Sequence, residues 1–380
     1  MIISIEEVKC HVGYSESDFL EAVQKSLFKL IKGKKLLRQL NITNSEDKII
    51  IRPENIEITK KSLDARKKPE LYHVFNVNVY LNENVPESKN SGLMGNLSCT
   101  HTSKNNVNKS DNKIVIAGSG PAGLFAALTL VNNGLAPVII ERGSEVSKRI
   151  RDVNLFWGSG LLNPKSNVQF GEGGAGTFSD GKLTSGIKSP YCRKVLETFV
   201  QSGASSDILI SSKPHIGTDI LRKVVVNIRK YLISKGARFY FETRLSDIKT
   251  CDGTLEGIYL ESVDDFEKKT VKFMPADTLI LATGHSARDT FSMLYNCGVR
   301  MISKPFSMGV RVEHKQKDIN LSRYGMQNPK INEMLPSADY KLSCHLPNGR
   351  SVYSFCMCPG GMVIASSSSE EQVVTNGMSY

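Results

Sequence analysis

Apolar and polar positions follow two different periods over residues 1–83. Helical spacing of large apolar side chains predicts a helix over Ser17–Ile31. Alternation with a period of two predicts a strand over Tyr72–Leu81, and short apolar runs predict strands at Ile2–Val8 and Lys48–Arg52. Together these elements predict a small α/β domain at residues 1–83.

The pattern stops over residues 84–112. This stretch is rich in Asn, Ser, Lys and Thr and has few large apolar residues. Such a composition cannot bury enough apolar surface to offset the entropy cost of ordering the chain. We therefore predict a flexible, low-complexity linker between two folded parts.

A second and larger α/β pattern starts at Lys113. An apolar strand, a Gly-rich turn, a helix through about Asn133 and a strand ending at Glu141 follow one another directly. Residues 155–190 are rich in Gly and Ser and predict irregular structure. A helix is predicted over Gly217–Lys235 from its apolar face. Later apolar runs predict strands at Arg238–Glu242, Leu255–Leu260, Val271–Phe273 and Thr278–Ala282.

Composition and charge narrow the class of protein. The 380 residues include 49 Lys and Arg against 38 Asp and Glu, a formal net charge of +11. The basic residues are spread along the chain, which favours a solvated surface over a nucleic-acid-binding patch. The eight cysteines form no CxxC pair, which is typical of reduced thiols in an intracellular protein.

Membrane insertion and secretion are not expected. No stretch reaches the roughly 20 apolar residues of a membrane span. The N-terminal sequence also lacks the basic and apolar regions of a secretory signal. We expect an intracellular protein, in the cytoplasm or in a plastid or other organelle.

The strongest chemical motif is the Gly-rich turn that follows the strand at Lys113. Gly118 permits a tight turn, Gly120 lets a pyrophosphate approach the backbone, and Gly123 lets the helix pack closely on the strand. The N-terminus of the helix favours an anion. Glu141 ends the second strand, where a carboxylate accepts from ribose hydroxyls and repels a 2′-phosphate. The candidate dinucleotide contacts here are Gly118, Gly120, Pro121, Ala122, Gly123, Glu141 and Arg142.

Two further segments favour FAD over NAD as the dinucleotide. The apolar strand at Thr278–Ala282 runs into Thr283 and Gly284, small residues that let the chain pass close to the cofactor. The Gly-rich loop at 171–182 offers backbone donors without steric bulk, through Gly173, Gly174 and Thr177 among others. A flexible solvent loop is the alternative interpretation of this second segment.

The remaining candidates for chemistry are weaker. Cys356 and Cys358 have the spacing of a redox pair, although plain packing is the favoured interpretation of two thiols in a strand-like context. His285 is a candidate polar contact or, more simply, a hydrogen-bonded structural histidine. No metal site is predicted, because the metal-ligating residue types do not cluster.

The chain resembles the uncharacterised FAD-dependent proteins of bacteria and plastids that are described as NAD/FAD-utilising dehydrogenases. The resemblance is carried by SLDARKKPELYHVFNVNVYL (62–81), AGSGPAGLFAAL (117–128), NVQFGEGGAGTFSDGKLTS (167–185), PHIGTDILRKVVVNIR (214–229), LATGHSARDTF (281–291), KPFSMGVRVEH (304–314) and YSFCMCPGGMV (353–363). It implies FAD contacts at Gly118, Gly120, Glu141, Gly173, Gly174, Thr177 and Gly284.

The resemblance also implies an α/β fold with three parts. These are a Rossmann-like FAD-binding domain of the glutathione-reductase type, an inserted β-rich substrate domain, and a small N-terminal α/β domain that is ferredoxin-like. Residues 1–83 would form the small domain and 84–112 the linker. Residues 113–299 would form the FAD-binding domain, with its Gly-rich loop at 167–185. Residues 300–380 would form part of the substrate domain.

Two departures from the family pattern affect the expected function. Residues 84–112 look like an insertion, and family members continue past Tyr380 with a further Gly-rich segment, so we expect a copy shortened at its C-terminus. The expected function is that of a FAD-dependent oxidoreductase with a small-molecule substrate, an electron donor or acceptor, and NAD(P)H as a transient reductant. The alternatives are a FAD-containing RNA-modifying or RNA-binding protein, and a non-catalytic fragment with an incomplete FAD site.

Overall fold

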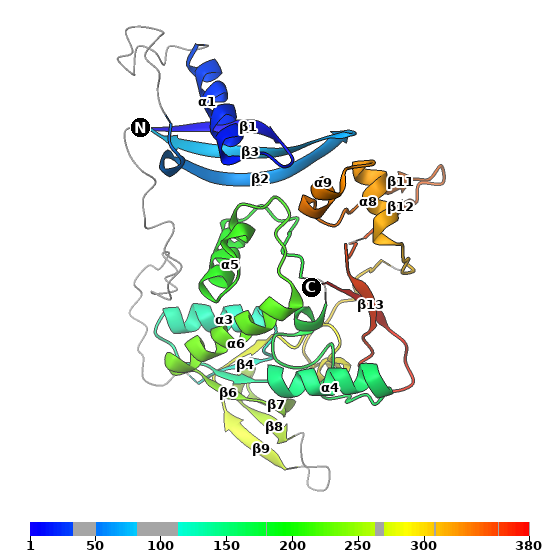
Figure 1. Ribbon diagram of the computed structural model, residues 1–380. Coiled ribbons are helices and arrows are strands. Elements are labelled where there is room, and N and C mark those ends of the chain that lie inside the picture. Colours follow the sequence, from blue (N-terminus) through cyan, green and yellow to red (C-terminus); the bar gives the residue numbers. More distant parts are fainter. Residues whose placement is uncertain are drawn as a thin grey trace.

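The N-terminal part of the chain forms a three-stranded antiparallel sheet with one helix packed on it. The computed structural model describes residues 1–32, 51–81, 113–179, 181–262, 270–307, 309–355 and 357–379. The strands are β1 (Ile2–His11), β2 (Ile56–Lys67) and β3 (Glu70–Tyr80), in the order β1-β3-β2. Helix α1 (Glu16–Lys32) covers one face of this sheet (Figure 1).

The alternating pattern of β3 explains how this small core forms. Phe75, Val77 and Val79 point to one face and are buried against Val23 and Leu27 of α1. The predicted periodicity of the helix and of β3 is therefore confirmed.

The strand predicted at Lys48–Arg52 is wrong where it can be checked. Ile51 and Arg52 lie outside any strand, and residues 48–50 fall outside the described residues. The pairing strand of the sheet is β2 instead, which runs from Ile56 to Lys67 and is mostly polar. The linker predicted at 84–112 also lies outside the described residues.

A parallel sheet forms the centre of the larger part of the molecule. Its strands are β4 (Ile114–Ala117), β5 (Val138–Ile140), β6 (Arg238–Tyr240) and β10 (Thr278–Leu281), in the order β10-β4-β5-β6. Every pairing is parallel, so the carboxyl ends of all four strands meet at one edge of the sheet. The fold is thus mixed α/β, as predicted.

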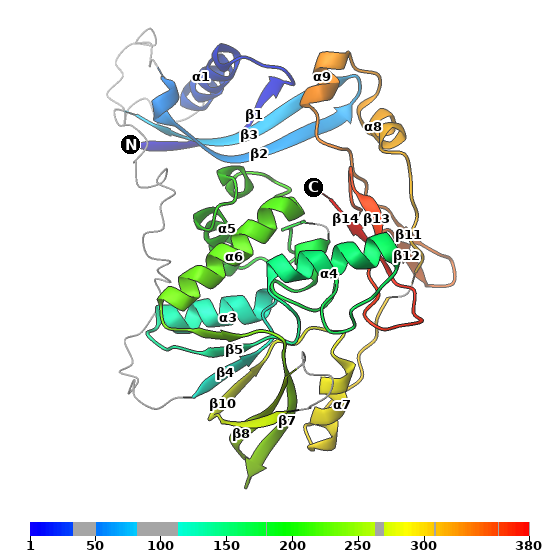
Figure 2. The same cartoon turned by 60° about the horizontal axis from the view of Figure 1, so that its bottom comes forward.

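Each face of the parallel sheet is covered by different elements (Figure 2). Ile116 and Ile139 face helices α3 (Pro121–Asn132) and α6 (Thr218–Ser234). Val115 and Ile140 face a three-stranded antiparallel sheet. That second sheet consists of β7 (Thr243–Cys251), β8 (Thr254–Ser262) and β9 (Val271–Pro275). Continuous apolar runs at β4 and β5 follow from this burial on both faces.

Several shorter elements surround these layers. They are α4 (Val146–Ser159), α5 (Pro190–Gln201), α7 (Arg288–Asn296), α8 (Gln316–Tyr324), α9 (Pro329–Met334), the hairpin β11 (Ser343–His345) with β12 (Ser351–Tyr353), and the hairpin β13 (Met362–Ala365) with β14 (Thr375–Met378). The β13–β14 hairpin packs on α4, where the indole N–H of Trp157 donates to the Ala365 carbonyl at 2.9 Å.

The N-terminal sheet contacts two parts of the chain that follow much later. The backbone of Lys61 in β2 forms a bridge with residues 210–212, at 2.7 Å to the Ile210 carbonyl and 2.9 Å from the Ser212 amide. Helices α8 and α9 pack on the sheet through Tyr324 and Ile331, which meet Leu71. These contacts fix the N-terminal sheet beside α8 and α9 (Figures 1 and 2).

We predict that the N-terminal sheet loses stability in mild acid because of His73. The ring is half-buried against Tyr14 and Phe75, and its Nδ1 has no partner among the described residues. Burial, helped by nearby Lys61, lowers the pKa of His73 from 6.5 to about 4. The folded state therefore binds this proton less tightly than the unfolded chain, so stability falls as the pH drops from 6.5 towards 4.

Replacing His73 with phenylalanine tests this assignment. The His73→Phe variant should keep the apolar contacts and unfold at a temperature that depends less on pH over that window. Thermal unfolding followed by circular dichroism between about pH 7 and pH 4 measures the effect. An equally steep pH dependence in the variant would show that His73 is not responsible.

Candidate functional site

Two glycines at the turn between β4 and α3 cannot be replaced by another residue without a clash. Gly118 has a φ of 108°, and a Cβ there would lie 2.3 Å from the Ala282 carbonyl oxygen. A Cβ at Gly123 would lie 1.9 Å from the carbonyl oxygen of Gly118. These two glycines thus allow α3, β4 and the end of β10 to approach one another closely.

Gly120 differs from its two neighbours in the motif. It is the N-cap of α3 with a φ of −71°, which any residue can adopt. A Cβ at Gly120 would meet only Gly174, at 3.7 Å from its Cα. The space in front of this backbone is therefore open, next to the free amides at the start of α3.

A cavity of about 420 Å³ lies at the carboxyl ends of β4, β5 and β10. Nine of the predicted contact residues line it: Gly118, Gly120, Pro121, Ala122, Glu141, Arg142, Gly174, Thr283 and Gly284. The other three do not line it. Gly123 packs on the turn, Gly173 lies against Thr177, and the buried Thr177 hydroxyl donates to the Glu172 carbonyl at 3.2 Å.

The carboxylate of Glu141 connects three segments around this cavity. Its Oε2 accepts from the amide and the hydroxyl of Ser119, both at 2.8 Å. Its Oε1 accepts from the amides of Gly143 at 2.9 Å and Gly171 at 3.2 Å. A carboxylate offers about four acceptor positions, so the protein itself fills all of them. Glu141 is buried and fixes the turn, the segment after β5 and the Gly-rich loop relative to one another.

A buried arginine of helix α4 holds the Gly-rich loop. Arg149 of α4 is fully buried and donates to three carbonyls, those of Asn167 at 2.9 Å, Val168 at 3.0 Å and Glu172 at 2.6 Å. Burial lowers the pKa of Arg149 to about 10, so the guanidinium stays charged at neutral pH. The loop at 171–182 is therefore anchored where it passes the cavity, at Gly171 and Gly174.

The side chain of Glu172 fixes the same loop from another direction. It is fully buried, and it accepts from the Val146 amide at 2.8 Å and from Arg229 at 2.7 Å. Burial raises the pKa of this carboxyl, while the Val146 amide and the Arg229 cation oppose the rise. The buried side chains of Arg149 and Glu172 thus determine the path of the loop without the help of strand pairing.

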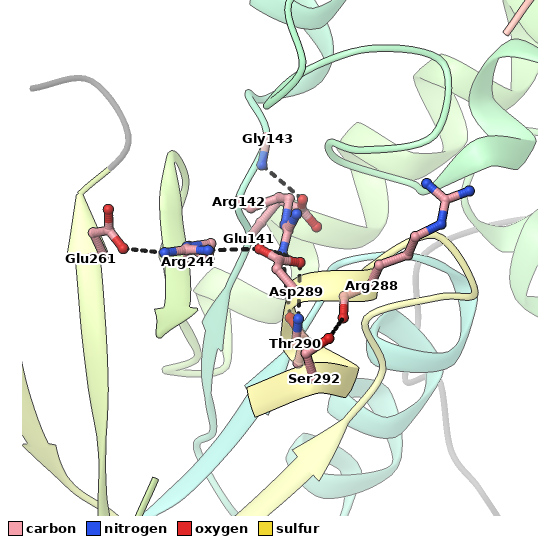
Figure 3. Close-up of polar contacts among 9 residues, drawn as sticks. All are labelled: Glu141, Arg142, Gly143, Arg244, Glu261, Arg288, Asp289, Thr290 and Ser292. Carbon is pink, nitrogen blue, oxygen red and sulfur yellow. Dashed lines mark hydrogen bonds and ion pairs between the residues drawn. The ribbon is translucent and has the colours of Figure 1, made fainter. Parts of the chain in front are cut away.

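The side chains of Arg142, Arg244 and Asp289 lie close together (Figure 3). Arg142 donates to both oxygens of Asp289, at 2.8 and 3.0 Å, and Arg244 donates to the same carboxylate at 2.7 Å. The second arm of Arg244 donates to Glu261. Both arginines line the cavity beside Glu141.

Sequence patterns missed several of these residues. Arg149 and Arg244 belong to no motif singled out in the sequence, and Asp289 lies in the segment 281–291 without having been singled out; each acts on residues far away in the sequence. Asp289 does follow the Thr283-Gly284 segment closely, at the start of α7, where an acid is favoured by the helix dipole. That position, together with its place in the segment 281–291, was the local signal for it.

Of the two cysteine candidates, only Cys358 can be placed, and it does not line the cavity. Cys358 is half-buried and lies against the backbone of Gly361 and Gly377. Cys356 falls outside the described residues. His285 lines the cavity, and its Nδ1 lies 2.9 Å from the Ser286 hydroxyl.

The described part of the chain contains no group of three or more metal-ligating side chains. Within the same residues, no helix is both long enough and apolar enough to cross a membrane.

Residues 305–380 match a family model described as "FAD-dependent protein, C-terminal domain-like". This match supports a FAD-dependent family. An uncharacterized protein of Clostridium beijerinckii is 41% identical over 358 residues, which cover 91% of this chain and 63% of the relative. The chain thus spans less than two thirds of the length of that relative.

Solved structures similar to this chain resemble it weakly. The THI4 protein of Thermovibrio ammonificans is 17% identical, with a TM-score of 0.34 over 50% of this chain and 64% of that one. The bacillithiol disulfide reductase of Bacillus cereus is 17% identical, with a TM-score of 0.26 over 46% of this chain and 40% of that one. Similarity at this level does not indicate a function.

Replacing Glu141 with glutamine should destabilise the fold. An amide nitrogen at this position would face backbone N–H groups, and at least one buried donor would lose its acceptor. We expect a loss of about 2 kcal/mol or more in the free energy of unfolding. The surface variant Glu197→Gln, which affects only an exposed pair with Arg193, should lose less than about 0.5 kcal/mol. Urea unfolding compares the two, and equal losses would contradict the role given to Glu141.

A methyl group on Gly123 should disrupt the turn, because it would overlap the Gly118 carbonyl. We expect Gly123→Ala to cost about 3 kcal/mol or more, or to prevent folding. A Cβ on Gly158 in α4 would meet no atom within 4 Å, so Gly158→Ala should be neutral or stabilise by up to about 1 kcal/mol. Unfolding curves of both variants provide the check, and a stable Gly123→Ala protein would refute the close packing.

Proposed function

We propose that this chain binds FAD and acts as a flavoprotein oxidoreductase. The observation that carries the proposal is the open space in front of Gly120, at the N-terminus of α3 and beside the carboxyl ends of β4 and β5. Open parallel sheets bind dinucleotides at this position. The match of residues 305–380 to a FAD-dependent family adds independent support.

The residues around the cavity fit a pyrophosphate. Gly120 and Gly284 carry no side chain, and a Cβ at Gly284 would meet nothing within 4 Å. The free amides and the dipole at the start of α3 favour an anion there. We assign the pyrophosphate to the space between Gly120, Gly174 and Thr283, and the adenosine to the end beside Glu141.

The ribose has to compete for Glu141, because four protein donors already occupy its carboxylate. Three of the donors are backbone amides whose positions the chain fixes. The hydroxyl of Ser119 is the exception, since rotation about one bond moves it away from Oε2. A ribose hydroxyl would then take its place.

When bound, FAD would supply the hydride-accepting ring for oxidation of a small molecule. The protein would bind and orient this group and exclude water from it. We further propose that the substrate is a small molecule, that a separate electron donor or acceptor takes part, and that NAD(P)H serves as a transient reductant. We also propose that the FAD domain has the glutathione-reductase-type arrangement and that the chain divides into domains near residues 83, 112 and 299. The family match does not favour the RNA-binding alternative.

Purified protein tests the proposal directly. We expect a flavin absorption spectrum, or its appearance on adding FAD, and release of FAD on denaturation. Bound flavin that a reductant such as NADH or NADPH bleaches would support an oxidoreductase. A folded protein that takes up no FAD would disprove the proposal for this chain.

Gly120→Ala separates binding of the cofactor from folding. Alanine fits the backbone conformation and the space around Gly120 in the protein, but its methyl group would occupy the approach of the pyrophosphate. We expect unchanged stability and a loss of about tenfold or more in FAD affinity, measured by titration of flavin fluorescence. Gly186→Ala, with nothing within 4 Å, is the matched control and should bind FAD normally. Equal FAD affinity in both variants would argue against this position for the pyrophosphate.

A further inference from the structure

Arg142 is held in one orientation by three neighbours. Its Nη2 donates to both oxygens of Asp289 and lies 3.3 Å from the Thr290 hydroxyl. Its guanidinium carbon lies 4.5 Å from the centre of the Phe170 ring. Only 17% of the Arg142 side chain is exposed, so its planar guanidinium lies beside the cavity with little freedom to move.

Arg244 is held by the same carboxylate from the opposite side. It donates to Asp289 with one arm and to Glu261 with the other, and it lies in β7 where that strand forms part of the cavity wall. Figure 3 shows Asp289 between the two arginines, with Arg288 of the same helix pointing away from them. A single aspartate therefore positions two arginines that come from different segments.

The charges at this end of the cavity compensate one another. Two arginines face two carboxylates, Asp289 and Glu261, and neither carboxylate lines the cavity. Burial raises the pKa of Asp289, but the hydrogen bonds from Arg142 and Arg244 outweigh it and keep the pKa below its usual range. Asp289 is thus charged at neutral pH, and the arginines have no uncompensated charge to offer an anion.

An arginine near the ribose position is the usual partner of a 2′-phosphate in dinucleotide sites. Here Nη2 of Arg142 and Nη1 of Arg244 are directed at Asp289, and Nη2 of Arg244 is directed at Glu261. One planar face of the Arg142 guanidinium lies over Phe170, and the other suits stacking on an aromatic base.

We propose that Asp289 sets the specificity of the cavity for an adenine dinucleotide without a 2′-phosphate. It acts as a positioning residue, because it holds Arg142 and Arg244 in fixed orientations beside the adenosine and compensates their positive charge. This inference rests on the proposed binding of FAD and names the group that distinguishes it from a phosphorylated dinucleotide.

Removal of the Asp289 charge tests the inference. The full chain is titrated with FAD, and ADP-ribose and 2′-phospho-ADP-ribose then compete against FAD, monitored by flavin fluorescence. The wild type should prefer ADP-ribose. In Asp289→Asn the ratio of the two affinities should shift about tenfold towards the phosphorylated probe, as expected for a charge-assisted hydrogen bond gained. The gain should fall as salt increases.

Three further variants make the result specific. Asp289→Glu restores the charge and should keep the preference of the wild type. Asp289→Ser is a second neutral variant in case the asparagine protein does not fold. Asp339→Asn removes an equivalent charge from a pair with Lys213, at a similar exposure of 34% against 38%, and should leave the ratio unchanged.

The possible outcomes separate the two proposals. A wild type that binds FAD, together with an unchanged ratio in Asp289→Asn and Asp289→Ser, overturns the role of Asp289 alone. Equal weakening of both probes in these variants also overturns it, because a purely structural residue would act in that way. A folded wild type that binds neither FAD nor ADP-ribose overturns both proposals.

Discussion

The four hydrogen bonds to the Glu141 carboxylate are the interaction on which the rest of the cavity depends. They join the turn after β4, the segment after β5 and the Gly-rich loop, through Ser119, Gly143 and Gly171. None of these segments is a helix or strand at the point of contact, so no regular ladder fixes them. A buried acceptor with all its positions filled does so instead, and each donor would carry a desolvation cost without it.

The Gly-rich loop beside the cavity is held in a similar way by arginines, which donate hydrogen bonds where Glu141 accepts them. Arg149 satisfies three carbonyls of the loop at 167–172, through hydrogen bonds from its guanidinium. Arg229 in turn holds the buried Glu172. Burial of such groups is unfavourable on its own, and it is offset only when the loop closes around them with correct geometry. The loop therefore has one well-determined path despite its glycines.

Sequence periodicity predicted the elements that carry a clear pattern. The strand and helix around Gly118 and the alternating strand β3 follow from local rules that hold within a few residues. Strand β2 was missed because it is polar and only half-buried, and it pairs with β3 through its backbone. Strand β7 and helix α4 were missed for a related reason, since their burial depends on partners distant in the sequence.

The candidate site likewise has residues that the sequence predicted and residues that it did not. Glycines are recognisable because backbone conformation and close approach demand them, and nine of the predicted contact residues do line one cavity. Arg149, Arg244 and Asp289 were not predictable, because each owes its place to a hydrogen bond with a residue that only the folded chain brings near. Motifs thus identify backbone requirements, and long-range polar networks need the structure.

The contact between the N-terminal sheet and helices α8 and α9 has a consequence for the order of assembly. Ribosomes produce β1 and β3 early, but Val12 and Leu71 are covered by Tyr324 and Ala338, and Tyr324 follows Leu71 by 253 residues and Val12 by 312. Until then these apolar side chains lack the partners that cover them in the folded chain. The small sheet can form early, yet its final docking has to wait for the synthesis of α8 and α9.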